Sequence, residues 1–393
     1  MTDSASLYRC FAATAPGLEP LAAAELRALG IAGVAEAGGV AWEGTAEQLY
    51  AANLWLRTAS RVTVRVAEFR ARSFIELERH ARRLLWETWV RKGEPVRLRV
   101  TSKKSKLYHE GAIAERLLGW IGERVGGIGA ATAAKGVEDE DDGATGDAQL
   151  FVVRAVRDGF TISADSSGAL LHLRGYRQAL AKAPLRETLA AATLLGSGWT
   201  GDAALLDPMC GAGTIPIEAA LIARNVAPGL ATADRTPRAY AFTAWPGFDA
   251  DAWTRVVEQA REAIRPAAEV PIIGSDRDEG AIGAAAANAE RAGVSEDVEL
   301  SVRSLSAIDA RTGPGWLVSN PPYGVRVGES APLRNLYAAL GRVARERLPG
   351  WTLALLSADR ALEGQVGVPF TEALRTSNGG IPVRLVTARV PGV

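Results

Sequence analysis

The 393-residue sequence predicts an α/β fold, in which a Rossmann-like, doubly wound domain follows an N-terminal α+β region. Beyond residue 169, short apolar runs alternate with helical patterns, as in a parallel sheet that is covered by helices. Within this part, residues 205–220 (LLDPMCGAGTIPIEAA) combine a buried strand, an acidic strand end, a glycine-containing turn and the start of a helix. Because 48% of the residues are hydrophobic, a chain of this length can form two or three packed domains.

The first unit of the α+β region is expected to span residues 1–66. Its strands are expected at residues 8–13, 40–42 and 62–66, and its helices at residues 20–29 and 46–56. Pro20 near the start of the first helix and Gly30 just past its end follow the usual placement of these residue types. This alternation of strands and helices is typical of a small α+β domain.

A second α+β unit is expected over residues 67–168. Its predicted elements are a helix at residues 74–91, a strand at 95–101, a helix after residue 106, and a hairpin of residues 150–156 and 160–165 that turns through Arg157, Asp158 and Gly159. Residues 137–147 (VEDEDDGATGD) are acidic and lack hydrophobic periodicity, which predicts a flexible loop.

Positive charge is concentrated in residues 54–135, although the formal net charge of the whole chain is zero. This segment holds 18 Lys and Arg against 8 Glu and no Asp. Within it, Lys103, Lys104 and Lys106 come just before an amphipathic helix, where basic side chains and helix amides can hold phosphates together. Two interpretations follow, a nucleic-acid surface and a solvated basic face.

The larger domain is expected to span residues 169–393. Its strands are predicted at residues 205–207, 272–276, 298–302, 316–320 and 351–357, and its helices at 185–195, from the glycine turn to about 223, at 281–292 and at 333–348. Pro184 suits the start of the first of these helices. The first two strands are far apart in the sequence, so residues 224–265 are expected to form an insertion. Its aromatic residues predict that this insertion is a packed flap. These residues are Tyr240, Phe242, Trp245, Phe248 and Trp253.

Three signals at strand ends predict a nucleoside-binding site. Asp207 closes the first strand of this domain, Gly211 and Gly213 lie in the turn after it, and Asp276 closes the next strand. Glycines let the backbone approach a ligand, and an acid at the end of the second strand can accept both hydroxyls of a ribose. The turn lacks the GxGxxG spacing of dinucleotide sites and the GK[ST] of phosphate loops, which favours a nucleoside without phosphates. S-adenosylmethionine is therefore the predicted cofactor.

The stretch SNPPYG predicts the group that receives a methyl group. Asn320, Pro321, Pro322 and Tyr323 follow a later strand, so they are expected at the same edge of the sheet as the cofactor. An exocyclic amine of a base is a weak nucleophile, because its lone pair is delocalised into the ring. The Asn320 side-chain oxygen and the Pro321 carbonyl can accept its hydrogens, and the two prolines stiffen the backbone that carries these acceptors. Tyr323 is placed to stack on the base, which must be unpaired or flipped out.

The motifs DPMCGAGTIPIEAA and SNPPYG, the segment LHLRGYR and the basic α+β unit before them resemble the THUMP-containing class I RNA methyltransferases. Within that class, the sequence is similar to the bacterial enzymes that form N2-methylguanosine in large-subunit ribosomal RNA. The resemblance covers nearly the whole chain. It implies a ferredoxin-like domain over residues 1–66, a THUMP domain that holds RNA over residues 67–168, and a class I methyltransferase domain over residues 169–393.

The resemblance also implies roles for individual residues. The cofactor would be bound by Asp207, Met209, Gly211, Gly213, Thr214 and Asp276, and the target amine by Asn320, Pro321, Pro322 and Tyr323. RNA would be bound by Lys103, Lys104, Lys106, Arg174 and Arg177, and residues 185–188 would border the target pocket. The sequence departs from the family at the adenine end of the cofactor, where an acid often follows the third strand. Here Ser304 stands at that place, so either Ser304 makes the contact or Asp309 replaces it.

The leading interpretation is an RNA methyltransferase that acts on N2 of a guanosine in 23S ribosomal RNA. Two alternatives keep the same chemistry, namely guanine-N2 methylation of transfer RNA and adenine-N6 methylation of RNA or DNA. A third, from another class, is an RNA-binding scaffold, which the two intact motifs disfavour. Direct methyl transfer needs no covalent enzyme intermediate, and this fits a chain whose cysteines, Cys10 and Cys210, lie outside the proline-rich motif.

Other partners are not expected from the sequence. The two cysteines and three histidines have no metal-ligand spacing, so no metal site is predicted. No apolar run reaches the roughly 18 residues that a membrane span requires, and the N-terminus has no signal pattern. A soluble, cytoplasmic protein is therefore expected, with its oligomeric state and the choice between naked RNA and a ribosome-assembly intermediate left open.

Overall fold

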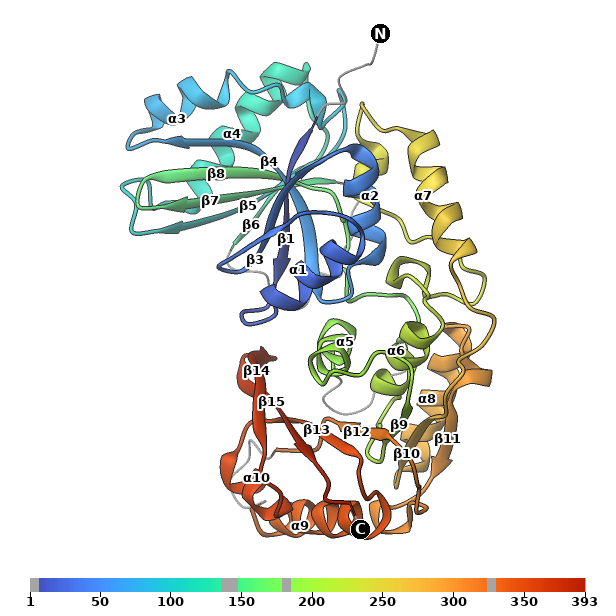
Figure 1. Ribbon diagram of the computed structural model, residues 1–393. Coiled ribbons are helices and arrows are strands. Elements are labelled where there is room, and N and C mark those ends of the chain that lie inside the picture. Colours follow the sequence, from blue (N-terminus) through green and yellow to red (C-terminus); the bar gives the residue numbers. More distant parts are fainter. Residues whose placement is uncertain (1–6, 136–147, 179–184, 324–329, 393) are drawn as a thin grey trace.

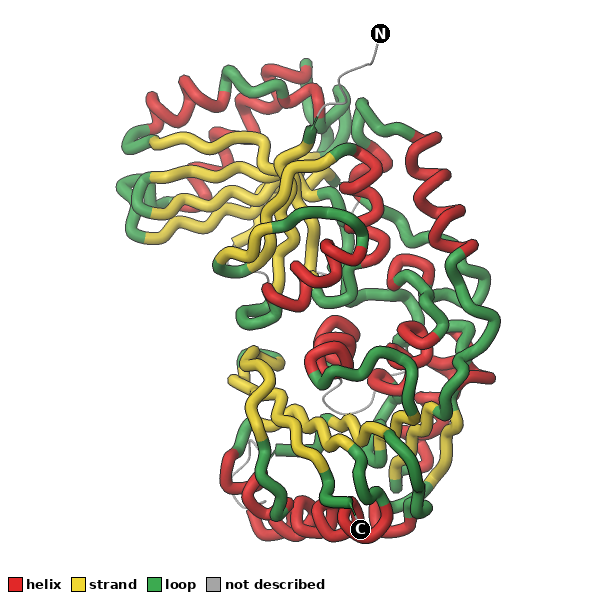
Figure 2. The backbone as a smooth tube through the Cα atoms, in the orientation of Figure 1, coloured by secondary structure: helices red, strands yellow, loops and turns green. Residues whose placement is uncertain are grey.

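The computed structural model describes residues 7–135, 148–178, 185–323 and 330–392. These residues form two separate β-sheets, one in the N-terminal region and one in the C-terminal domain, with helices around each (Figures 1 and 2). The predicted acidic loop at residues 137–147 and the predicted helix start at Pro184 lie outside the described residues.

The N-terminal sheet has eight strands in the order β2-β3-β1-β4-β8-β7-β5-β6. The strands are β1 (Tyr8–Thr14), β2 (Val34–Glu36), β3 (Gly39–Gly44), β4 (Ala59–Arg70), β5 (Val96–Lys103), β6 (Ala131–Lys135), β7 (Gln149–Val156) and β8 (Gly159–Asp165). The helices are α1 (Glu19–Ala28), α2 (Ala46–Trp55), α3 (Phe74–Ala81) and α4 (Glu110–Val125). The predicted turn of the β7–β8 hairpin is confirmed, with positive φ at Arg157 and Asp158.

Strand β4 joins the two α+β units that the sequence predicts. Its first half pairs with β1 and its second half pairs with β8, so the sheet continues without a break from one unit into the other. The expected boundary at residue 66 therefore falls inside a strand of 12 residues. The apolar pattern does not stop there, because Phe69 continues it and stacks on Phe160 of β8.

The helix expected at residues 74–91 is shorter than predicted. Helix α3 ends at Ala81, and a 3₁₀ turn, η1 (Trp86–Thr88), follows it. The indole N–H of the buried Trp86 donates a hydrogen bond of 2.8 Å to the carbonyl oxygen of Ala81. This bond satisfies a carbonyl group at the end of the helix and turns the chain inward, so the apolar residues of η1 join the core without continuing α3.

The C-terminal sheet has seven strands in the order β11-β10-β9-β12-β13-β15-β14. The strands are β9 (Ala204–Asp207), β10 (Ile272–Asp276), β11 (Glu299–Val302), β12 (Gly315–Ser319), β13 (Thr352–Ser357), β14 (Thr371–Asn378) and β15 (Ile381–Arg389). The helices are α5 (Glu187–Gly196), α6 (Thr214–Ala223), α8 (Glu279–Arg291), α9 (Ser330–Arg347) and α10 (Arg360–Val366). The first five strands are parallel and were predicted, whereas the antiparallel β14–β15 hairpin at the edge was not.

Residues 224–265, the predicted insertion, bridge the two halves of the molecule. They contain the 3₁₀ turns η2 (Pro228–Leu230) and η3 (Ala241–Ala244) and helix α7 (Ala250–Glu262). The Phe242 ring stacks on Tyr50 of α2 at a centroid distance of 4.4 Å, and the Trp253 ring meets Tyr50 edge-on. The Tyr50 hydroxyl accepts a hydrogen bond of 3.1 Å from the Asp249 backbone N–H. The predicted aromatic packing is confirmed, but the segment is a bridge to the N-terminal region and not a flap, because its rings pack against α2.

Candidate active site

Asp207, Asp276 and Asn320 lie at one edge of the C-terminal sheet. Strands β10 and β12 flank β9 and run parallel to it. Asp207 ends β9, Asp276 ends β10, and Asn320 directly follows β12. Because the carboxyl ends of parallel strands meet at the same edge, the fold brings together the two acids and the amide that the sequence predicted for one site.

Asp207 is buried beneath this edge, with 1% of its surface exposed. Its Oδ1 accepts a hydrogen bond of 2.7 Å from the Ser319 hydroxyl and one of 3.1 Å from the Met209 backbone N–H. Burial raises the pKa of Asp207 to about 7, although both hydrogen bonds lower it. Sequence reasoning missed Ser319, whose one signal was its position directly before Asn320.

The two glycines after β9 shape the turn in different ways. Gly211 has a φ of +53°, and nothing lies within 4 Å of the place where a Cβ would stand. Gly213 has a φ of +82°, and a Cβ there would lie 2.8 Å from the Ala285 Cβ on helix α8. Helix α6 begins at Thr214, which is buried. The turn is thus open at Gly211, where a ligand can approach the backbone, and tightly packed at Gly213.

Asp276 is hydrogen-bonded to the same turn. Its Oδ2 accepts a hydrogen bond of 3.0 Å from the Gly211 backbone N–H, and its Oδ1 accepts one of 3.0 Å from the Asp278 backbone N–H. Each carboxylate oxygen has a further lone pair, so the side chain can still accept hydrogen bonds from hydroxyl groups. Asp276 therefore holds the turn in place and can still accept hydrogen bonds from the ribose hydroxyls, as the sequence predicts.

Ser304 and Asp309, the two candidates for the adenine contact, are both exposed on the segment after β11. The Asp309 carboxylate lies 2.5 Å from the Arg303 guanidinium, and this hydrogen-bonded pair holds the pKa of Asp309 below its usual value. The Ser304 hydroxyl lies 3.2 Å from the Ser306 hydroxyl. The Asp309 carboxylate keeps further lone pairs beside its bond to Arg303, so both residues remain candidates for the adenine contact.

The side-chain oxygen of Asn320, Oδ1, is buried and has no hydrogen-bond partner among the residues that the structure describes. A buried polar atom without a partner costs about 1–3 kcal/mol, and such atoms in native proteins call for an explanation. A ligand that donates a hydrogen bond would supply one. Pro321, the next residue, is buried, and Pro322 is exposed.

Tyr323 is held by the C-terminal hairpin. Its hydroxyl accepts a hydrogen bond of 2.7 Å from Nδ2 of Asn378, the last residue of β14. The chain then turns through Gly379 and Gly380, both with positive φ. Asn378 lies 55 residues from Tyr323 in the sequence, and it was missed because the hairpin itself was not predicted.

Arg174 and Arg177, which were predicted to bind RNA, are engaged inside the protein. Arg174 is 3% exposed, donates a hydrogen bond of 2.8 Å to the Arg57 carbonyl oxygen and lies 3.5 Å from Glu218 Oε1. Arg177 donates two hydrogen bonds of 3.0 Å to Glu187. The prediction for Arg174 is wrong, because its buried pairing with Glu218 on α6 removes the guanidinium from the surface. Arg174 instead connects the N-terminal region to the helix that follows the glycine turn.

Lys103, Lys104 and Lys106 are exposed at the end of β5 and in the loop that leads to α4. The Asp158 carboxylate accepts a hydrogen bond of 2.7 Å from the Lys106 backbone N–H, which attaches this loop to the β7–β8 turn. A shallow groove that Arg70 and Arg154 help to line opens on the β7–β8 hairpin. Lys103 is in register with Val156 of that groove, so the three lysines and the groove share one end of the sheet.

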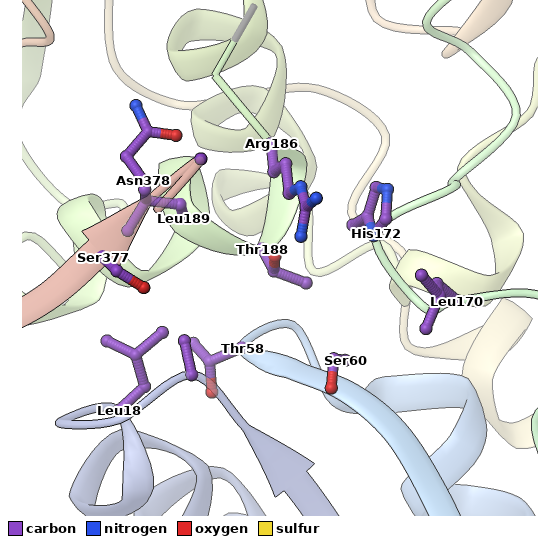
Figure 3. A pocket seen from close by; sticks show the side chains of 12 residues that line it. Leu18, Thr58, Ser60, Leu170, His172, Arg186, Thr188, Leu189, Ser377 and Asn378 are labelled. Atoms are coloured by element: carbon purple, nitrogen blue, oxygen red, sulfur yellow. The ribbon is translucent and has the colours of Figure 1, made fainter. Parts of the chain in front are cut away.

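A cavity of about 130 Å³ lies where the N-terminal region, helix α5 and the β14–β15 hairpin meet, and we call it the junction cavity (Figure 3). Residues from each of these parts line it, among them Leu18, Thr58, Leu170, His172, Arg186, Thr188, Leu189, Ser377 and Asn378. The segment 185–188, predicted to border the target pocket, therefore contributes to the cavity wall. Asn378 belongs to this wall and also binds Tyr323.

Three further features of the described part of the chain concern metals, membranes and cysteine chemistry. There, no group of three or more His, Cys, Asp or Glu side chains could hold a metal ion. Nor do the described helices include one with the length and apolar character needed to cross a membrane. Burial raises the pKa of the Cys210 thiol, so this cysteine is not activated as a nucleophile.

The fold and the site define a class I methyltransferase. Among solved structures, SMU.472, provisionally described as a methyltransferase and complexed with SAH, is 29% identical, with a TM-score of 0.85 over 98% of each chain. A possible methylase from Clostridium difficile 630 is 31% identical, with a TM-score of 0.85 over 99% of each chain. TrmN from Thermus thermophilus shares the fold, with a TM-score of 0.67 at 20% identity over 98% of this chain and 100% of that one.

The chain belongs to the UPF0020 family of RMKL-like methyltransferases. The model of the RMKL-like methyltransferase domain matches residues 174–386, and the model of the RlmL ferredoxin-like domain matches residues 9–63. A relative from Synechocystis sp. PCC 6803, provisionally named RNA methyltransferase slr0064, is 33% identical over 98% of this chain and 97% of its own. The ribosomal RNA large subunit methyltransferase K/L of Syntrophotalea carbinolica is 37% identical over 96% of this chain and 53% of its own. The chain thus spans about half the length of the K/L relatives.

Proposed function

We propose that this protein transfers a methyl group from S-adenosylmethionine to the exocyclic N2 amine of a guanosine in 23S ribosomal RNA, in the cytoplasm. The observation on which the proposal rests is the buried, unpartnered Oδ1 of Asn320 at the sheet edge that also carries Asp207 and Asp276. An exocyclic amine has two hydrogens to donate, and an amide oxygen accepts one of them. The RNA part of the proposal is supported by relatives that are named as RNA methyltransferases.

The residues at the edge fit S-adenosylmethionine, which supplies an electrophilic methyl group when bound. Asp276 offers acceptors to the ribose hydroxyls, and Ser304 or Asp309 is the proposed contact at the adenine end. Asp207, whose Oδ1 accepts a hydrogen bond from the Met209 N–H, and Thr214, the first residue of α6, are the proposed contacts of the methionine part. The open backbone at Gly211 leaves room for the nucleoside. The relative SMU.472 binds SAH, the product form of this cofactor, which supports the same assignment here.

In this arrangement Asn320 and Pro321 orient the target amine. Hydrogen bonds from the amine to the Asn320 Oδ1 and the Pro321 carbonyl oxygen draw electron density toward nitrogen and direct the lone pair out of the base plane. Pro321 and Pro322 restrict the backbone, so these acceptors are in position before the substrate arrives. Tyr323, fixed through its hydroxyl by Asn378, provides the ring on which the base stacks. The base must leave its helical stack to reach this place.

RNA is proposed to lie across the N-terminal region. Lys103, Lys104 and Lys106 are exposed at one end of its sheet, together with the groove that Arg70 and Arg154 help to line. Such positive side chains bind phosphates without regard to sequence. We assign residues 67–168 to a THUMP unit that holds the RNA and that shares β4 with the unit of residues 1–66, and we assign residues 169–393 to catalysis.

The proposal is tested by incubating the purified protein with isotope-labelled S-adenosylmethionine and with unmodified 23S ribosomal RNA, transfer RNA or DNA, followed by nucleoside analysis. The expected product is N2-methylguanosine from ribosomal RNA. Label in transfer RNA would identify the alternative substrate, and label in N6-methyladenosine would identify the alternative base, as in the predicted N6-adenine-specific DNA methylase from Listeria monocytogenes that shares this fold. Absence of N2-methylguanosine from every RNA would refute the proposal.

A further inference from the structure

The junction cavity opens beside the tip of the β14–β15 hairpin. Ser377 and Gly379, which line it there, are exposed, whereas Thr58 and His172 of its wall are buried. The cavity can therefore admit a ligand from solvent at the hairpin and enclose it further in. One water requires roughly 10–15 Å³ of such a space, so about 130 Å³ has room for a group of the size of a phosphate.

The wall of the cavity is rich in hydrogen-bond donors. Among the described residues that line it, Arg186 carries a positive charge and none carries a carboxylate. Figure 3 shows the Arg186 guanidinium directed into the cavity. The same wall holds the hydroxyl groups of Thr58, Ser60, Thr188 and Ser377. Because a guanidinium has five N–H donors, Arg186 can bind an anion in addition to its contacts within the protein, and its planar shape suits the oxygens of a phosphate.

The surroundings of the cavity favour negative charge. The pKa of His172 is lowered to about 3 by burial and by the positive charges of four arginines, namely Arg186, Arg174, Arg177 and Arg238. Arg174 and Arg177 are paired with carboxylates, whereas Arg238 donates hydrogen bonds of 2.9 and 2.7 Å to backbone carbonyl oxygens. Positive charges that oppose the protonation of His172 stabilise an anion at the same place.

The cavity adjoins the proposed target pocket. Asn378 belongs to the cavity wall, and its Nδ2 donates the 2.7 Å hydrogen bond to the Tyr323 hydroxyl. In the proposed function the target base stacks on the Tyr323 ring. The sugar and the phosphates that are attached to this base therefore pass close to the cavity.

We infer that the junction cavity binds a backbone phosphate of the RNA substrate, adjacent to the target guanosine. The inference rests on the proposed function, because it adds a further contact with the same substrate. Arg186 and the hydroxyl groups of the wall donate hydrogen bonds to the phosphate oxygens, and three leucines keep water away from them, namely Leu18, Leu170 and Leu189. Electrostatic attraction is stronger where water is excluded. The cavity thus positions the RNA strand, while Asn320 holds the amine of the base.

Substitutions of Ser377 test the cavity without removing a buried group. Ser377 is exposed on β14, so Ser377→Asp should fold and place a negative charge at the mouth of the cavity. The KM for unmodified 23S ribosomal RNA should rise about tenfold, the usual effect of losing hydrogen bonds to a charged group, while kcat stays within about twofold. Ser377→Asn, which is neutral and of similar size, should keep the KM of the wild type. Ser295→Asp, at an exposed serine beside β11, is the control for the added charge.

The phosphate itself is located by ethylation interference. A transcript of 23S ribosomal RNA is sparsely ethylated at its phosphates, which removes the negative charge there. RNA that the full-length protein binds is separated from free RNA, and both are cleaved at the ethylated positions. Ethylation of one phosphate beside the methylated guanosine should weaken binding by about tenfold in the wild type and in Ser377→Asn. In Ser377→Asp the same ethylation should have no effect, because the contact is already lost.

The outcomes separate the inference from the proposed function. Methyl transfer to 23S ribosomal RNA without interference at a phosphate beside the modified guanosine, or with interference that persists in Ser377→Asp, would overturn the inference alone. A loss of affinity for S-adenosylhomocysteine in Ser377→Asp, measured by calorimetry, at an unchanged KM for RNA would assign the cavity to the methionine carboxylate of the cofactor and would overturn the inference as well. If the wild type methylates no RNA, the proposed function fails and the inference fails with it.

Discussion

The Ser319 hydroxyl donates a hydrogen bond of 2.7 Å to Oδ1 of Asp207, and both residues are buried. This bond connects β12, which leads into the Asn-Pro-Pro-Tyr motif, to β9, which leads into the glycine turn. The proposed amine-binding and cofactor-binding halves of the site are therefore joined through one polar contact. Because the contact is buried, its strength depends on the protonation state of Asp207.

The buried carboxyl of Asp207 should make stability depend on pH. Its pKa is raised from 3.8 to about 7, chiefly by burial, so folding takes up a proton between about pH 4 and pH 7. The stabilisation by the protonated form is complete below about pH 4 and is lost as the pH rises through about 7. Asp207→Asn removes this titration, so the free energy of unfolding of the wild type should fall relative to the variant over this range, by on the order of 4 kcal/mol at most.

Denaturant unfolding of both proteins at pH 5 and pH 8 measures this difference. Asp202→Asn, at an exposed carboxylate of the same domain, is the control for the change in net charge. Parallel pH profiles of the wild type and Asp207→Asn would show that Asp207 titrates alike in the folded and the unfolded chain.

Replacing Asn320 by Ala should separate catalysis from cofactor binding. The substitution removes the unpartnered Oδ1, so we expect methyl transfer to fall by about 10²–10³-fold, the usual loss for one preorganised hydrogen-bonding group at a reacting centre. Affinity for S-adenosylhomocysteine, measured by calorimetry, should stay within about twofold. Undiminished turnover would show that another group holds the amine.

Asp276→Ala should weaken cofactor binding. It removes the acceptor of the Gly211 N–H together with the proposed ribose contact, and a loss of about 1.5–3 kcal/mol corresponds to roughly a 10- to 100-fold higher Kd for S-adenosylhomocysteine. Asp278→Ala is the matched control, since Asp278 is the N-cap of α8 and accepts the Ala281 N–H. The control should lower stability by about 1 kcal/mol and preserve affinity. Equal affinity losses in the two variants would assign the effect of Asp276 to the fold of the turn.

Removing Lys103, Lys104 and Lys106 together should reduce the salt dependence of RNA binding. Each phosphate that is no longer neutralised by a lysine lowers the slope of log K against log salt by roughly 0.7 for single-stranded RNA, so a decrease of about 2 is expected from filter binding at several salt concentrations. The control is the double variant Arg342→Ala with Arg360→Ala. These arginines lie on helices α9 and α10, at the far end of the molecule, so the slope should stay unchanged (Figure 1). An unchanged slope in the lysine variant would make these residues a solvated surface.

The sequence predicted the five parallel strands of the C-terminal sheet, most of which have buried side chains, and the motifs at their ends. Asp207 and Asp276 were identifiable because each closes a short predicted strand, and a parallel sheet places such ends together. The β14 strand was missed because most of its residues are exposed at the sheet edge, so it lacks a clear apolar alternation. Asn378, which binds the Tyr323 hydroxyl, was missed for the same reason.

Arg174 shows a second limit of sequence reasoning. A charged side chain in a glycine-containing segment indicates a surface position, since unpaired charges are rarely buried. Burial became acceptable because Glu218, 44 residues away on α6, meets the guanidinium in the interior. Tyr176 donates a further hydrogen bond of 3.0 Å to the same carboxylate. Partners of this kind are set by the tertiary fold, and no local pattern around Arg174 indicates them.

The most direct test of the proposed activity is nucleoside mapping of RNA from a strain that lacks this gene, compared with its parent. We predict that one N2-methylguanosine disappears from 23S ribosomal RNA, and that the wild-type gene restores it while the Asn320→Ala variant does not. Retention of every N2-methylguanosine in the 23S ribosomal RNA of the mutant strain would contradict the account.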